Sequence, residues 1–199
     1  MNQQIVERIQ RMDKEKVETQ LVLQCAPLIV GLKTSSLFFI YKEQLNQLYF
    51  LLEGSQLDCY VLRETVEKAA VFLYNQKRLE HCLAGNRVRH FLAAAGYSRW
   101  EPEQVLNRFR VRYQAYAGQE ADFPHELGLL LGYPPEDVEG FIRNRGKNFL
   151  YTGYWKVYYN VPAKRDLFHM YELSKETLIQ LVSNGVALVE IMEAYSGNR

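Results

Sequence analysis

The segment 123–148 holds the residues whose types are best suited to chemistry. His125 follows Pro124 at the expected start of a short helix, and Glu126 is its neighbour, about 100° away around the helix axis. The positive end of a helix dipole favours an uncharged imidazole, which can act as a general base or as a ligand. The sequence therefore nominates His125 and Glu126 as catalytic residues. The alternative is that both cap the helix, since acids and capping groups are common at helix starts.

Cys25 is the second candidate for catalysis. A cysteine with a base nearby in space can be a nucleophile, so Cys25 with His125 would suit thiol-dependent transfer or hydrolysis. No local signature of a known thiol enzyme surrounds it. Packing in the core is the competing interpretation, because free cysteines are among the most buried residues. Cys59 and Cys82 are expected to pack in the same way.

Four further residues are predicted to bind a ligand: Lys33, Tyr133, Tyr154 and Lys156. Lys33 follows an apolar run and can hold an anionic group or form a Schiff base, and Lys156 can do the same. Tyr154 belongs to an aromatic-rich run whose rings can stack on a flat ligand. The competing interpretations are surface lysines and an aromatic core strand.

Motifs for metals and nucleotides are missing from the sequence. The four histidines form no His-x-x-x-His or His-Glu-x-x-His pattern. There is no Walker loop, no Gly-x-Gly-x-x-Gly and no Gly-x-Ser-x-Gly elbow. We therefore expect no metal site, and the cofactor is left unknown.

Composition and charge narrow the class of protein. Hydrophobic residues make up 48% and charged residues 24% of 199 residues, as in ordinary globular domains. The net charge of +1 argues against nucleic-acid and membrane partners. Three cysteines without a Cys-x-x-Cys pair indicate a reducing compartment. The sequence shows no signal peptide and no apolar run long enough for a bilayer. We expect one cytoplasmic domain over residues 1–199.

The elements expected to position these residues are mostly helices. A β-α-β-β unit near 36–75 predicts a small antiparallel sheet, with strands at 36–41, 57–63 and 68–74 around a helix at 43–53. An aromatic strand near 149–159 is expected to join the same sheet. Two short helices flank the turn at Gly132 and Pro134. Other helices are expected at 2–12, 76–83, 86–95, 101–116, 162–173, 175–184 and 186–195. The fold class is α+β, helix-dominated.

Several motifs together resemble a domain-of-unknown-function family found mainly in anaerobic bacteria. They are Cys25-Ala26-Pro27 with Gly31-x-Lys33, Phe123-Pro124-His125-Glu126-x-Gly128, Gly132-Tyr133-Pro134, Asp137-Val138-x-Gly140-Phe141-Ile142, Gly146-Lys147-Asn148 and Gly153-Tyr154-Trp155-Lys156-Val157-Tyr158. The resemblance covers most of the chain and departs at Thr34, where it implies a proline. It implies a cytosolic bacterial setting and no particular reaction.

Two functions follow as hypotheses. The first is a protein that binds a small molecule or cofactor between the His125 helix, the Cys25–Lys33 segment and the strand at 149–159. In an enzymatic version, His125 would act with Cys25 or Lys33. The alternative is a non-catalytic interaction or regulatory module that grips a partner protein through 76–116 or the C-terminal helices, with a homodimer also left open.

Overall fold

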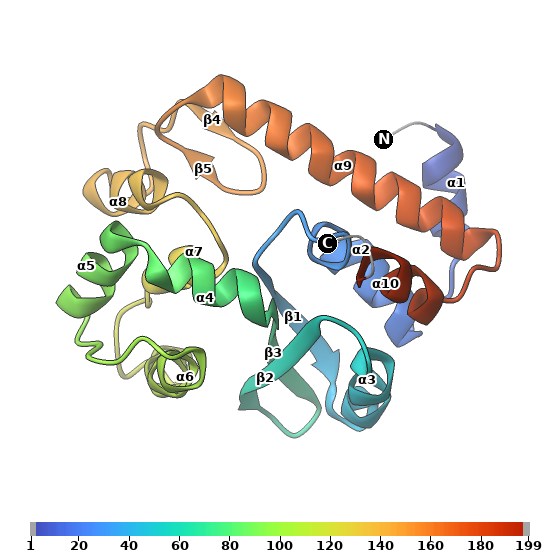
Figure 1. Cartoon of the computed structure of the whole chain (residues 1–199), viewed down its shortest axis with the longest axis horizontal. Helices are drawn as coiled ribbons and strands as arrows, with labels where there is room; N and C mark the ends of the chain where they lie inside the picture. Colours follow the sequence, from blue (N-terminus) through green and yellow to red (C-terminus); the bar gives the residue numbers. More distant parts are fainter. Residues whose placement is uncertain (1–2, 197–199) are drawn as a thin grey trace.

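Helices pack on both faces of a three-stranded antiparallel sheet (Figure 1). The structure is a computed structural model that describes residues 3–196. The strands are β1 (Ser35–Tyr41), β2 (Leu57–Glu64) and β3 (Lys68–Asn75), in the order β1-β3-β2. This confirms the predicted α+β class and the predicted sheet.

The central strand β3 is buried on both faces. Its residues 69–73, Ala-Ala-Val-Phe-Leu, form a continuous buried apolar run, as expected for a strand covered on both sides. Since successive side chains point to opposite faces, Val71 and Leu73 join one hydrophobic cluster and Ala70 and Phe72 join another. Each face of the sheet therefore needs its own layer of helices.

The terminal parts of the chain cover the first face. This layer contains α1 (Gln3–Arg11), α2 (Val17–Ile29), the 3-10 turn η1 (Lys42–Gln44), α3 (Leu45–Leu52), the C-terminal half of α9 (Val161–Ser183) and α10 (Leu188–Ser196). Helix α2 continues through Pro27 to Ile29, although a proline disfavours helical geometry at the residue before it. Beyond it, the backbone N–H groups of Leu32 and Lys33 donate to the Pro27 carbonyl at 2.8 and 3.0 Å, which closes the helix end.

The middle of the chain covers the second face. Helices α4 (Gln76–Ala84), α5 (Asn86–Ala94), α6 (Pro102–Ala117), α7 (Glu126–Leu130) and α8 (Pro135–Arg143) follow one another there. Local sequence signals explain where three of these helices, α4, α6 and α8, begin. The Asn75 side chain accepts the Arg78 N–H at 3.0 Å at the beginning of α4, and Pro102 and Pro135 occupy first turns, where a missing N–H costs little.

The aromatic segment after α8 forms a separate hairpin. Strands β4 (Tyr151–Thr152) and β5 (Lys156–Val157) pair only with each other, so the expectation that this segment joins the main sheet is wrong. The hairpin packs instead on α9, where Trp155 meets Phe168 edge-on with ring centroids 4.5 Å apart. Apolar contact with a helix thus replaces strand pairing as the stabilising contact.

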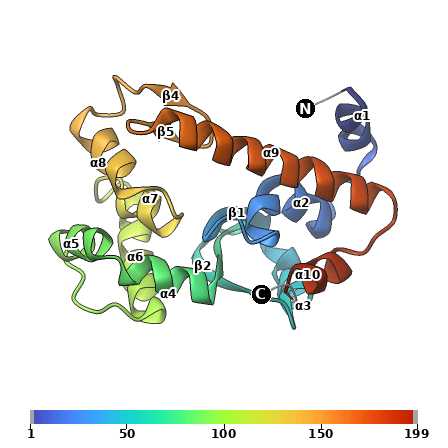
Figure 2. The ribbon, with the colours of Figure 1, turned by 45° about the horizontal axis from the view of Figure 1, so that its top comes forward.

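One long helix, α9, replaces the two helices predicted between residues 162 and 184. Ser174 does not break it, because its hydroxyl donates to the Tyr171 carbonyl at 2.7 Å within the helix. The helix runs from the hairpin to α1 (Figure 2) and contacts α2 on the way. No helix among residues 3–196 is long and apolar enough to cross a membrane.

Replacing Gly140 with alanine should destabilise the protein by about 1–3 kcal/mol, the usual cost of overpacking. The new Cβ on α8 would lie 2.6 Å from Cβ and Cγ of Tyr158, beside β5. Gly118→Ala is the matched control, since its φ of −85° is an ordinary value and its Cβ would meet nothing closer than 3.3 Å. Urea unfolding followed by circular dichroism measures both. Equal stabilities for the two variants would contradict the close approach of α8 to the hairpin.

Candidate functional site

An aromatic groove lies where α7 and α8 meet the β4–β5 hairpin. Its volume is about 360 Å³ and its lining is mainly apolar. The lining residues are Phe123, His125, Leu127, Gly128, Leu131, Tyr133, Asp137, Val138, Phe141, Tyr154, Trp155 and Lys156. They come from segments up to 33 positions apart, so the groove exists only once the hairpin has docked on the helices.

Stacked rings form one wall of the groove. Tyr133 stacks on Trp155 with ring centroids 4.6 Å apart, and the edge of Phe168 supports Trp155 from α9. Tyr154 packs edge-on against Tyr171 at 4.9 Å, and its hydroxyl donates to Glu172 at 2.8 Å. These contacts hold the rings in fixed orientations, which gives a flat and rigid wall.

His125 lies between two phenylalanine rings. Its ring centroid is 5.3 Å from that of Phe123 and 5.8 Å from that of Phe141. Within residues 3–196 the imidazole makes no hydrogen bond, and the side chain is only half-buried. Its ring nitrogens are therefore available to a molecule in the groove.

Asp137 joins α8 to the hairpin. The carboxylate is buried and accepts three hydrogen bonds: Trp155 Nε1 donates to Oδ2 at 2.8 Å, and the backbone N–H groups of Tyr158 and Tyr159 donate to Oδ1 at 2.7 and 3.1 Å. Its position in the first turn of α8 adds the favourable helix dipole. Asp137 thus orients the Trp155 indole in the groove wall while its own charge is satisfied.

Lys156 carries a positive charge on the groove wall. Its Nζ donates to the Gly146 carbonyl at 2.7 Å and lies 5.7 Å from the ring centroid of Phe141 and 5.1 Å from that of Phe149. In the described part of the chain no carboxylate is within 4.0 Å of this ammonium group.

The loop that reaches Lys156 has a left-handed backbone. Arg145, Gly146 and Asn148 have φ values of 50°, 70° and 55°, of which only the glycine value is free of strain. At Gly146 an added Cβ would also meet the Phe141 ring at 3.1 Å. A glycine is therefore required where the loop presents its carbonyl to Lys156.

Four of the seven nominated site residues line the groove together: His125, Tyr133, Tyr154 and Lys156.

The Glu126 side chain does not line the groove. It is buried and pairs with Arg112, and the Tyr97 hydroxyl donates to it at 3.1 Å. Burial, together with the neighbouring Glu126 carboxylate, raises the pKa of Tyr97. Glu126 therefore ties α6 and the segment after α5 to α7.

Cys25 and Lys33 do not line the groove. Cys25 is fully buried in the cluster on the first face, and burial raises the pKa of its thiol to about 12 despite Lys33 and a hydrogen bond with Ser36. Burial also lowers the pKa of Lys33, whose Nζ lies 5.7 Å from the Tyr133 ring centroid. Lys33 is thus next to the groove wall, whereas Cys25 belongs to the core.

The sequence arguments missed Asp137 and Phe141 as site residues. Their local patterns have ordinary explanations: an acid such as Asp137 favours the first turn of a helix, and Phe141 belongs to an apolar helix face. The available signal was the spacing: Asp137 and Phe141 lie one turn apart on α8, so they point to the same side.

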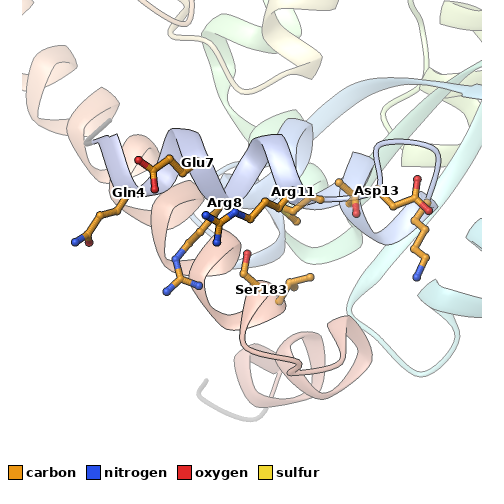
Figure 3. Close-up of a pocket in the computed structure, with 10 residues that line it drawn as sticks. Gln4, Glu7, Arg8, Arg11, Asp13 and Ser183 are labelled. Atoms are coloured by element: carbon orange, nitrogen blue, oxygen red, sulfur yellow. The ribbon is translucent and has the colours of Figure 1, made fainter.

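A second, more polar hollow lies between α1 and α9 (Figure 3), with a volume of about 590 Å³. Arg8 and Arg11 contribute positive charges, and Glu7 and Asp13 contribute negative ones. Arg8 Nη1 donates to the Asn184 side chain at 3.0 Å, beside the negative end of α9. This hollow is explained by the docking of α1 on a helix end.

Residues 3–196 contain no group of three or more potential metal ligands.

Comparison with known proteins gives a family but no function. A family model described as a protein of unknown function matches residues 21–192, which include every residue of the groove. No curated protein and no solved structure matches the chain. The match confirms the predicted resemblance to a family of unknown function.

Replacing Asp137 with asparagine should destabilise the protein by about 2–3 kcal/mol. The amide oxygen can accept from only one side, so the new NH₂ group would face either the Trp155 indole N–H or the backbone donors of the hairpin. Urea unfolding monitored by circular dichroism measures the loss. Asp122→Asn, at an exposed position, controls for the loss of one charge. If the Asp137→Asn variant is as stable as the unmodified protein, the hydrogen bonds of Asp137 do not hold the hairpin.

The Cys25 thiol should resist alkylation until the protein unfolds. With a pKa of about 12 the thiol stays protonated at pH 8, and only the thiolate reacts. Iodoacetamide labelling with mass spectrometry in rising urea measures this. Cys82 is the internal reference, because burial raises its pKa too but its side chain is partly exposed. Rapid labelling of Cys25 in native buffer would make it a candidate nucleophile again.

Proposed function

Since the chain belongs to the DUF3793 family, whose function is unknown, we propose its function from the groove: it binds a small, flat, largely apolar molecule there. One observation carries the proposal. Four residues that the sequence nominates line the same hollow: His125, Tyr133, Tyr154 and Lys156.

The size and lining of the groove fit a drug-sized molecule. Small-molecule sites usually have volumes of roughly 300–1,000 Å³ and apolar walls with a few polar groups. The groove has about 360 Å³, rings on its walls and the side chains of His125 and Lys156 as polar groups. The proposed ligand is therefore a flat molecule of two or three fused rings, whose faces can stack on the rings of the wall.

Contacts within the protein hold the wall of the groove in place. Asp137 and Phe168 hold Trp155 from two directions, and Trp155 supports Tyr133. Binding therefore does not have to order these rings, which lowers the entropy cost of association. The proposal includes no nucleophilic step by Cys25, because that thiol is buried in the other cluster.

We also propose a cytoplasmic location. The three cysteines are all free thiols, and none is paired in a disulfide. Unpaired thiols are typical of proteins that live in a reducing compartment.

The neutral dye N-phenyl-1-naphthylamine should bind and fluoresce in the groove, and Phe141→Ala should weaken this binding about tenfold. The substitution removes a ring that lines the groove and contacts His125, which is worth roughly 1–1.5 kcal/mol. A fluorescence titration gives both dissociation constants, and thermal melting confirms that the variant is folded.

Phe50→Ala is the matched control, because Phe50 is 72% exposed on α3 and belongs to the opposite face of the sheet. It should bind the dye as the unmodified protein does. Failure of the unmodified protein to bind the dye, or an equal loss in both variants, would refute the proposal that the groove is a ligand site.

A further inference from the structure

We propose that the groove selects ligands that carry an acidic group, such as an aromatic carboxylate or sulfonate, with the acid placed between Lys156 and His125. This inference rests on the proposed function and names the chemical class of the ligand. It follows from the charges around the groove and from the hydrogen-bonding groups that the protein leaves unused.

The Lys156 ammonium group has hydrogen-bond donors that the protein does not use. An ammonium group carries three N–H donors, and the Gly146 carbonyl at 2.7 Å takes one of them. The rings of Phe141 and Phe149 stabilise the charge but accept no conventional hydrogen bond. Because no carboxylate among residues 3–196 pairs with Nζ, an acidic group from a ligand would be its first full counter-charge.

His125 and Lys156 approach the same ring. The imidazole centroid is 5.8 Å and the Lys156 Nζ is 5.7 Å from the centroid of Phe141. Both side chains thus line the groove around Phe141, and the aromatic part of a ligand whose acid lies there extends toward Tyr133. The imidazole can supply a second N–H donor, since none of its nitrogens is hydrogen-bonded in the described chain.

Two carboxylates near the groove already accept hydrogen bonds from the protein. Asp137 accepts from three N–H groups, and Glu172 accepts from the Tyr154 hydroxyl at 2.8 Å. Lys33 adds a second positive charge next to the Tyr133 ring, although burial lowers its pKa. Two lysines therefore lie beside the rings of the groove.

A cationic ligand is disfavoured for the same reason. Aromatic cages often bind quaternary ammonium groups through the faces of their rings. Here the protein's own lysines already lie over two of those rings, Lys156 over Phe141 and Lys33 over Tyr133. A cationic ligand would meet repulsion from both, so the aromatic lining combines with an anion instead.

Two dyes with the same ring system test this inference. 8-Anilino-1-naphthalenesulfonate is N-phenyl-1-naphthylamine with one added sulfonate. The unmodified protein should bind the sulfonate about tenfold more tightly than the neutral dye, the factor that 1.4 kcal/mol gives. Lys156→Gln should abolish this preference, so that the variant binds the two dyes equally, whereas Lys156→Arg should keep it.

Lys147→Gln is the matched control, because it removes an exposed positive charge from the loop that contacts Lys156 and should preserve the preference. If Lys156→Gln does not fold, loss of the preference in high salt tests the same charge. Equal binding of the two dyes by the unmodified protein, or a preference that survives Lys156→Gln, would overturn the acidic-ligand inference alone. Failure of both dyes to bind would overturn the proposed function with it.

Discussion

The burial of β3 on both faces is the constraint on which the rest of the structure depends. An apolar strand with neighbours on both sides must be covered above and below, because either exposed face would leave a large apolar surface in water. Neither half of the chain can do this alone. Helices from both ends of the chain cover one face and α4–α8 cover the other. After α8 the chain has to return to the first face of the sheet, and α9 makes that connection along the outside of the molecule (Figure 1).

The aromatic groove is a consequence of this return. Before α9 begins, the chain forms the β4–β5 hairpin, whose aromatic residues pack on α9 and on Tyr133. Asp137 fixes the hairpin to α8 through three hydrogen bonds, so the two elements cannot slide past each other. Small residues allow the close approach: an added Cβ at Gly128 would lie 2.9 Å from Val138. The groove is the space that remains between these rigid parts.

The groove and the buried cysteine illustrate how burial assigns roles. Cys25 and His125 are both residue types used in catalysis, yet Cys25 is enclosed by apolar side chains that disfavour its thiolate. His125 keeps its nitrogens unbonded beside a hollow. Glu126, the immediate neighbour of His125, is committed to Arg112 and Tyr97. Adjacent positions at the start of one short helix therefore have different roles: His125 lines the groove, and Glu126 makes a buried contact.

The sequence by itself determined the α+β class, the strands of the main sheet and the helix starts at Pro102 and Pro135, because local rules of periodicity and capping act over a few residues. It also nominated His125, Tyr133, Tyr154 and Lys156 by residue type. Only the tertiary structure decided that these four meet, that Cys25 stays apart, and that the aromatic hairpin leaves the main sheet. Those outcomes depend on contacts between residues far apart in the chain, such as Asp137 with Trp155, which no local pattern encodes.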